Sequence, residues 1–292
     1  MILVTGANGQ VGQCIRQLAP QFPELSLIFM GSADLDITNR NAVRQIFQQN
    51  ELTGCINCAA YTAVDKAETN QPLAEAINVQ GTQWLAEGCS IRNIPFIHFS
   101  SDYVYHNAVN RPLVETDKVQ PKGIYARTKL QGEKVALRKY PNSMIVRTSW
   151  VYAPFGNNFV RTMLRLGAER PELNVVFDQI GTPTYAPDMA QAVLFLLQQV
   201  QRGELSTEAL AGIWHYSNEG VTSWYDFALA IFELANLPCK VNPILSVQYP
   251  TPAQRPAFSV LDKSKIKNAF GLDIPHWRQS LQACLKALES EK

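Results

Sequence analysis

The chain has 292 residues, of which 46% are hydrophobic and 17% are charged, and its formal net charge is +1. This composition predicts a globular protein, and the lack of a basic block argues against a nucleic-acid partner. No apolar run reaches about 18 residues, and the chain does not open with the segments of a signal peptide. We therefore expect a cytoplasmic protein with no membrane partner.

The chain begins with a short apolar strand over residues 1–5 that leads into three spaced glycines. The spacing is Gly-x-x-Gly-x-x-Gly, and an apolar helical stripe follows directly. A strand, a glycine-rich turn and a helix in this order are typical of dinucleotide-binding folds. We expect NADPH or NADH to bind here, with its pyrophosphate at the helix N-terminus. The cofactor-binding residues predicted from this turn are Gly6, Gly9, Gln10, Val11 and Gly12.

Strands and helices alternate through the first half of the chain. The further strands are expected at 25–30, 54–59, 95–99 and 144–147, and the helices at 11–19, after a cap at Thr38, at 71–92 and from Tyr125 to about Lys139. This alternation predicts an α/β fold with a Rossmann-type, doubly wound parallel sheet.

The second half is less regular, and we interpret it as a smaller C-terminal substrate lobe. Helices are expected near 158–168, 187–201, 223–235 and 276–289. The expected domains are an NAD(P)-binding Rossmann domain over 1–150 and a mainly substrate-binding lobe over 151–292. Some segments of 180–217 are expected to return to the Rossmann domain.

Tyr125 and Lys129 are the candidate catalytic pair. Residues four apart lie on the same face of a helix. An ammonium group beside a phenol lowers a pKa that starts near ~10, so Tyr125 could exchange a proton with a substrate oxygen. Ser101 follows a predicted strand, at the edge of the sheet where ligands bind. The pair alone also fits a surface helix with a solvated lysine.

The six cysteines and four histidines do not predict a metal site. Cys55 and Cys58 form a C-x-x-C pattern, but residues three apart on a strand point to opposite faces. We expect buried structural thiols. The histidines show no ligand spacing, so no metal ligands are predicted.

Longer blocks of the sequence resemble the dTDP-4-dehydrorhamnose reductases of the extended short-chain dehydrogenase/reductase superfamily. The blocks occur in the family's order over nearly the whole chain and lie at 59–68, 100–105, 125–134, 147–152, 156–159 and 254–256. The resemblance implies reduction of the 4-keto group of dTDP-4-dehydro-6-deoxy-L-mannose to dTDP-L-rhamnose. This product is a precursor of surface polysaccharides such as the lipopolysaccharide O-antigen.

The resemblance also implies roles for single residues. Tyr125 would donate the proton to the carbonyl oxygen, and Ser101 would donate a hydrogen bond to the same oxygen. Lys129 would lower the pKa of the phenol and bind the nicotinamide ribose. The implied substrate-binding residues are Ser101, Asp102, Trp150, Asn158 and Arg255. A turn aspartate, a core tryptophan and a solvated arginine remain the alternatives for Asp102, Trp150 and Arg255.

Further cofactor contacts are implied beyond the glycine turn. Asp36 and Ile37 resemble the pair that flanks the adenine, while Ala60, Tyr61 and Thr62 resemble the wall over the ribose and nicotinamide. The end of the second expected strand carries neither an acid nor an arginine. The sequence therefore favours neither NADH nor NADPH.

The expected partner is a dTDP-sugar substrate. Some family members dimerise around magnesium held by glutamates, but Gln13 and Pro187 stand at the matching positions here. We expect a monomer or weak homodimer without a magnesium bridge. Two alternatives stay open: another nucleotide-sugar epimerase or dehydratase, and a non-catalytic protein similar to the regulatory subunit of methionine adenosyltransferase.

Overall fold

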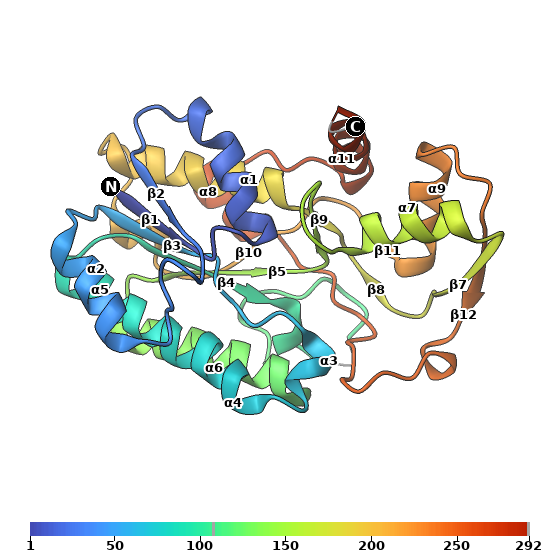
Figure 1. Cartoon of the computed structure of the whole chain (residues 1–292), viewed down its shortest axis with the longest axis horizontal. Helices are drawn as coiled ribbons and strands as arrows, with labels where there is room; N and C mark the ends of the chain where they lie inside the picture. Colours follow the sequence, from blue (N-terminus) through green and yellow to red (C-terminus); the bar gives the residue numbers. More distant parts are fainter. Residues whose placement is uncertain (107–108, 291–292) are drawn as a thin grey trace.

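A computed structural model describes residues 1–106 and 109–290 of the chain. Its centre is a six-stranded sheet in the order β10-β5-β4-β3-β1-β2, and every neighbouring pair is parallel (Figure 1). The strands are β1 (Ile2–Thr5), β2 (Leu27–Met30), β3 (Gly54–Asn57), β4 (Phe96–Ser101), β5 (Met144–Thr148) and β10 (Gly212–His215). The predicted α/β fold with a Rossmann-type parallel sheet is confirmed.

Helices cover both faces of this sheet (Figure 1). The helices are α1 (Gln10–Leu18) and α8 (Ala186–Gln201) on one face, and α2 (Arg40–Gln49), α5 (Thr82–Arg92) and α6 (Gly123–Lys139) on the other. Side chains alternate across a strand, so Ile2 and Val4 join the core under α1 and α8, whereas Leu3 joins the core under α2 and α5. Because both faces of β1 are buried, its sequence is apolar without interruption by alternating polar residues.

The helix expected over 71–92 is one helical stretch with a wider turn in its middle. It consists of α4 (Gln71–Glu75), a π-helical segment (Ala76–Gly81) and α5. Asn78 lies in the π-helical segment. Its Oδ1 accepts a hydrogen bond from the Tyr61 backbone N–H at 2.8 Å, and its Nδ2 donates to Thr128 Oγ1 at 3.0 Å. The wide turn thus connects the loop after β3 to α6.

Two of the expected boundaries that differ have a clear local cause. Asn39, not Thr38, caps α2, and its side chain accepts from the backbone N–H groups of Asn41 and Ala42. Thr38 instead donates to Asp36 Oδ1. Strand β3 ends at Asn57 rather than at residue 59, because the Asn57 side chain accepts from the Ala59 N–H and turns the chain.

The second half of the chain has a hydrophobic cluster of its own, built on α7, α9, α11 and the parallel pair β7–β12. Its elements are α7 (Phe159–Glu169), β7 (Glu172–Val176), α9 (Trp224–Leu234), β12 (Lys240–Ile244) and α11 (Trp277–Ser290). Short strands join it to the Rossmann unit: β6 (Val151–Tyr152), β8 (Ile180–Gly181), β9 (Thr184–Tyr185) and β11 (Thr222–Ser223). Between these segments, α8 packs on α1 and β10 extends the main sheet beside β5. Helix α10 (Ser264–Phe270) packs near β10.

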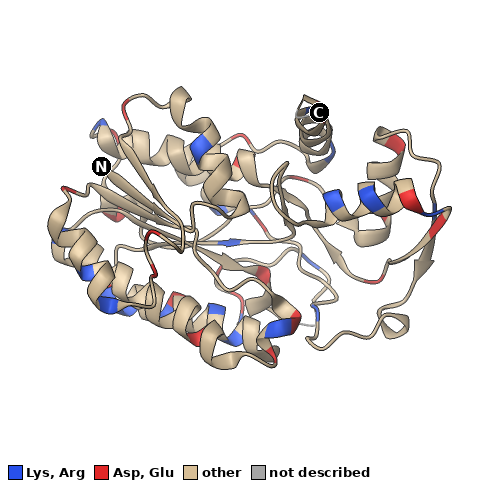
Figure 2. Ribbon diagram, viewed as in Figure 1, with Lys and Arg blue, Asp and Glu red and all other residues tan. Residues whose placement is uncertain are grey.

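The cysteines and the charged residues are placed as in an ordinary globular protein. The six cysteines all lie within the described residues and form no disulfide; Cys55 packs in the core under α2 and α5, whereas Cys58 packs against the opposite core. Over residues 1–106 and 109–290, no cluster of His, Cys, Asp and Glu has the arrangement of a metal site, and no helix has the length and apolar character to cross a membrane. Figure 2 shows acidic and basic residues interspersed over the outer helices.

Candidate active site

The carboxyl ends of the parallel strands bring the predicted site residues to one edge of the sheet. The glycine turn follows β1, the segment 59–62 follows β3, Ser101 ends β4, and Trp150 lies just beyond β5. This is the edge at which open α/β sheets bind their ligands. Helix α6 packs on β4 and adds Tyr125 and Lys129 to the same region.

The glycine turn has the geometry that a bound pyrophosphate requires. Gly6 has a φ of +61°, and a Cβ there would lie 2.5 Å from the Ala59 backbone nitrogen. A Cβ at Gly12 would lie 2.6 Å from the Gly6 carbonyl oxygen. Gly9 is the N-cap of α1, and neither a capping side chain nor an acid occupies the first turn. The positive helix end and its backbone N–H groups are therefore available to phosphates.

The remaining predicted cofactor residues lie around this turn, and they differ in their hydrogen bonds and burial. The Tyr61 backbone is fixed by Asn78, and Ala60, Tyr61 and Thr62 form the loop after β3. Asp36 is engaged with Thr38, and Ile37 is 3% exposed, so its side chain lies in the core rather than in an open groove. The position of Asp36 and Ile37 beside the adenine stays a prediction.

An acid that the sequence analysis did not place lies at the end of β2. Asp34 Oδ2 accepts a hydrogen bond from the Gly31 backbone N–H at 2.9 Å. A carboxylate at the end of the second strand is where dinucleotide-binding folds read the adenine ribose. It was missed because Asp34 lies four residues beyond the end of β2 and its side chain folds back toward Gly31.

Ser101, Tyr125 and Lys129 come together at the end of β4. Lys129 is 2% exposed, and its Nζ donates to the Phe99 carbonyl oxygen at 2.6 Å. Tyr125 is partly buried, and Ser101 is among the groups that influence its pKa. The Tyr103 ring meets the Tyr125 ring edge-on, with centroids 5.4 Å apart. Sequence analysis did not single out Tyr103.

The electrostatics of the pair differ from the expectation. Burial raises the pKa of Tyr125 to about 12, the hydrogen bond from Ser101 lowers it, and the Asp102 charge raises it. Burial likewise lowers the pKa of Lys129 to about 8, while the Glu133 charge raises it. Lys129 is not among the groups that shift the Tyr125 pKa. The predicted lowering of that pKa by Lys129 is therefore wrong for this arrangement, in which the ammonium points to Phe99.

Asp102 is buried beside Ser101 with one oxygen unpaired. Ser101 Oγ donates to Asp102 Oδ1 at 3.0 Å and accepts from the Tyr103 backbone N–H at 3.2 Å. Asp102 is 2% exposed, and its Oδ2 has no hydrogen-bond partner among the described residues. Burial raises the pKa of this carboxyl to about 6, against the lowering effect of hydrogen bonds that include Ser259 and Ser101.

A buried ion pair lies next to the cluster of Ser101, Tyr125 and Lys129. Arg147 donates to both carboxylate oxygens of Glu133, at 2.9 and 2.6 Å, and both side chains are 2% exposed. Ser100 Oγ donates to the same carboxylate at 2.5 Å, and the Tyr105 hydroxyl accepts from Arg147. Sequence blocks 132–134 and 147–152 contain both partners, but nothing in the sequence indicates that they pair.

One face of the Trp150 ring is covered by Trp224. The Trp150 backbone has a φ of +48°, and the two rings stack with centroids 3.6 Å apart and planes 10° apart. Trp224 begins α9, so the stack joins the two halves of the molecule. Trp150 is partly buried, and its sugar-facing role stays a prediction for the part of the ring that Trp224 does not cover.

Asn158 is engaged with the protein itself. Its Oδ1 accepts from the Arg161 N–H at 3.1 Å and caps α7, while its Nδ2 donates to the Ala153 carbonyl at 2.8 Å and to Gln10 Oε1 at 3.0 Å. Among the described residues, only the Arg161 N–H donates to Oδ1, so one lone pair of the amide oxygen is left for a substrate donor. In this structure Asn158 caps α7 and bridges to the glycine turn, and its substrate contact stays a prediction.

Arg255 is partly exposed, but its guanidinium is paired. It forms two 2.7 Å bonds to the two oxygens of Asp65, and Asp65 Oδ1 also accepts from the Ala253 N–H at 3.1 Å. Asp65 lies in α3 (Val64–Ala67), beside the loop that carries Arg255 (Figure 1). The ion pair joins two of the sequence blocks and ties this loop to the Rossmann unit, so a diphosphate would compete with Asp65 for the guanidinium.

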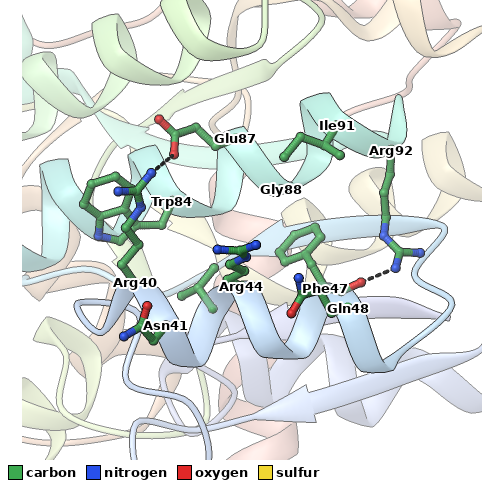
Figure 3. A pocket seen from close by; sticks show the side chains of 11 residues that line it. Arg40, Asn41, Arg44, Phe47, Gln48, Trp84, Glu87, Gly88, Ile91 and Arg92 are labelled. Atoms are coloured by element: carbon green, nitrogen blue, oxygen red, sulfur yellow. Dashed lines mark hydrogen bonds and ion pairs between the residues drawn. The ribbon is translucent and has the colours of Figure 1, made fainter.

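A pocket of about 580 Å³ lies between α2 and α5, away from all of these residues (Figure 3). Its arginines are partly occupied: Arg40 lies over the Trp84 ring and pairs with Glu87 at 3.8 Å, and Arg92 donates to the Phe47 carbonyl oxygen. None of the predicted site residues lines it. The chemistry of the chain is therefore gathered at the carboxyl edge of the sheet rather than in this pocket.

Comparison with known proteins agrees with this placement. The family model described as the RmlD substrate binding domain matches residues 1–290. A dTDP-4-dehydrorhamnose reductase from Aggregatibacter actinomycetemcomitans is 40% identical over 288 residues, which cover 96% of this chain and 97% of that protein.

Solved structures show the same likeness. A dTDP-4-dehydrorhamnose reductase from Clostridium acetobutylicum superposes with a TM-score of 0.91 at 39% identity and covers 99% of both chains. The enzyme of the same name from Bacillus anthracis, solved in complex with NADP, has a TM-score of 0.91 at 35% identity and covers 98% of both chains.

Proposed function

This chain belongs to the RmlD substrate binding domain family, and on that premise we propose that it catalyses the reaction of the dTDP-4-dehydrorhamnose reductases. It is an oxidoreductase that reduces the 4-keto group of dTDP-4-dehydro-6-deoxy-L-mannose to dTDP-L-rhamnose with NADPH or NADH. The observation that carries this conclusion is the likeness to reductases of this name over nearly the full length of both chains. It favours reduction over the epimerase, dehydratase and non-catalytic alternatives.

The residues of the glycine turn fit a dinucleotide. Gly6 and Gly12 allow a close backbone packing that a Cβ would prevent, and the N-terminus of α1 lacks a side-chain cap and an acid. When bound, the reduced nicotinamide supplies the hydride to C4 of the sugar. The backbone of Gly9, Gln10 and Val11 would hold the pyrophosphate, and the loop after β3 would border the nicotinamide side.

Tyr125 donates the proton that the carbonyl oxygen gains. Its hydroxyl lies beside that of Ser101, so both can donate to one oxygen on which negative charge develops. Lys129, which is buried one helical turn from Tyr125, would bind the nicotinamide ribose on leaving the Phe99 carbonyl. Asp102 and the accessible edge of Trp150 line the sugar side, and Arg255 would reach the diphosphate by leaving Asp65.

The division of labour between the halves is also a proposal. We assign cofactor binding to residues 1–150, together with α8 and β10, and substrate binding mainly to residues 151–292. The separate hydrophobic clusters of the two halves support this division. We further propose a cytoplasmic monomer or weak homodimer. Gln13 donates to the Asn8 carbonyl oxygen at 2.8 Å and offers no carboxylate to a bridging magnesium ion.

The test is the loss of reduced-cofactor absorbance when the protein is mixed with freshly made dTDP-4-dehydro-6-deoxy-L-mannose. A reductase consumes about one NADPH or NADH per sugar. An epimerase or dehydratase would convert the sugar with no net consumption, and a non-catalytic protein would do neither. No loss of signal with either cofactor would rule out the reductase.

A further inference from the structure

The hydroxyl of Ser101 has one proton and several neighbours that compete for it. In the structure this proton is donated to Asp102 Oδ1 at 3.0 Å. The oxygen accepts from the Tyr103 N–H at 3.2 Å, and Ser101 is also among the groups that influence the pKa of Tyr125. A serine hydroxyl donates one hydrogen bond and accepts up to two. While it donates to Asp102, Ser101 has no proton left for a substrate oxygen.

The charge of Asp102 decides where this proton goes. An ionised carboxylate only accepts, and hydrogen bonds to a charged acceptor are the stronger ones, so ionised Asp102 retains the Ser101 proton. A protonated carboxyl can donate to Ser101 Oγ instead. Ser101 then accepts from Asp102 and from the Tyr103 N–H, and its own proton becomes available to the carbonyl oxygen beside Tyr125.

We propose that Asp102 is a positioning residue whose protonation releases the Ser101 proton toward the substrate carbonyl oxygen, so that only the protonated form of Asp102 supports fast reduction. The inference rests on the proposed function and extends it from the residues that touch the carbonyl to the residue that orients one of them. It assigns Asp102 a role different from that of a simple contact to a sugar hydroxyl.

The surroundings of Asp102 favour its neutral form. Its Oδ2 is buried without a partner among the described residues, which is costly for a charged oxygen and much less so for a neutral one. The titratable groups that face it are Tyr103 and Tyr125, and the hydroxyls beside it belong to Ser101 and Ser259. No cation is among the groups that shift its pKa, which burial raises to about 6. A sugar that displaces water would raise this pKa further.

The decisive measurement is kcat/KM for sugar reduction between about pH 5.5 and 7.5, below the range in which Lys129 titrates. For the wild-type chain, kcat/KM should fall about tenfold per pH unit once the pH exceeds the pKa of Asp102, about 6. Activity at the acid end establishes the proposed function separately. A wild-type profile that stays flat over this range overturns the inference and leaves the reductase intact.

Asp102→Asn tests the direction of the hydrogen bond. The amide N–H donates to Ser101 Oγ at every pH, so the slope should shrink to less than about twofold over the whole range. Asp188→Asn is the matched control, because Asp188 is a partly buried carboxyl on α8 that accepts from Ser280 and Asn218, outside the residues assigned to the carbonyl site, and its pKa is also raised by burial. This control should keep the wild-type slope. A retained slope in Asp102→Asn, with only KM raised, would support the hydroxyl-contact role instead.

Ser101→Ala shows whether the effect runs through Ser101. The variant should be slow at all pH values and should have lost the slope, and adding Asp102→Asn should cost nothing further. A slope that persists in Ser101→Ala would mean that the Asp102 charge acts directly on the oxyanion, and it would overturn the inference. This comparison remains decisive even where Asp102→Asn fails to fold.

Discussion

The cofactor side and the substrate side of this molecule are held together by different kinds of contact. The glycine turn is built from backbone contacts between near neighbours, such as the hydrogen bond from the Gly9 N–H to the Gly6 carbonyl. The substrate side depends on side-chain pairs between distant segments: Asp65 with Arg255, Gln10 with Asn158, and Trp150 with Trp224. The glycine turn should tolerate substitutions at its non-glycine positions, but not a Cβ added to its glycines. The substrate side should be sensitive to the loss of either partner of a side-chain pair.

The largest effect on stability is expected at the buried pair beneath the site. Glu133→Ala leaves Arg147 as an uncompensated charge in the interior, which should cost about 3–5 kcal/mol in the free energy of unfolding. Chemical denaturation measures this loss. Glu169→Ala removes the exposed partner of Arg165 and should cost about 0.5 kcal/mol or less. Equal losses in the two variants would contradict the importance of long-range pairs.

The glycine turn should fail when a Cβ is added, whatever the side chain. Gly6→Ala combines a positive φ with a contact to the Ala59 backbone, so we expect a loss of roughly 3 kcal/mol together with much weaker NADPH binding. Gly203→Ala is the control, since φ is +72° there with no atom within 4 Å of the new Cβ. It should cost only about 1 kcal/mol. Similar losses at the two positions would mean that strain, rather than close packing, limits the turn.

The stability contributed by Asp102 should depend on pH in a defined direction. Its pKa rises from 3.8 to about 6 on folding, so the folded state holds this proton more tightly than the unfolded state. The favourable contribution is complete below about pH 4 and is lost as the pH rises through about 6. Asp102→Asn should therefore be more stable than the wild type above pH 6, by up to roughly 3 kcal/mol, and equal to it near pH 4. Thermal unfolding at the two pH values measures the difference; a destabilised variant at pH 7.5 would contradict it.

The smallest effect is expected at the half-exposed Asp65–Arg255 pair. Its contribution to stability should be about 1 kcal/mol or less and should decrease with salt. Asp65→Asn releases the guanidinium, so KM for the dTDP-sugar should fall about threefold while kcat stays the same. Arg255→Met should raise KM. Unchanged KM values in both variants would remove Arg255 from the substrate site.

The sequence predicts well what depends on local pattern. The glycine turn, the alternating elements and the Tyr125–Lys129 face need only spacing and hydrophobicity, and each is present in the structure. It does not predict partners that lie far apart in the chain. Nothing in the sequence indicates that the Asn158 amide donates to Gln10 and to the Ala153 carbonyl oxygen.

The sequence pattern also did not predict how burial changes the pKa values of the site residues. The expectation that Lys129 lowers the Tyr125 pKa considered two residues in isolation. Desolvation of both groups and the Phe99 carbonyl determine the result in the folded chain. The π-helical segment around Asn78 and the fold-back of Asp34 escaped prediction for a related reason, because both depend on contacts made only after the strands have paired.

The central claim is that Tyr125 protonates the sugar carbonyl at the carboxyl edge of the sheet. Its most direct test is the rate of NADPH oxidation with dTDP-4-dehydro-6-deoxy-L-mannose, for the wild type and for Tyr125→Phe, together with NADPH binding for both. We predict that the variant binds NADPH as the wild type does and loses at least about 100-fold in kcat. A Tyr125→Phe variant with the full wild-type rate would contradict the account.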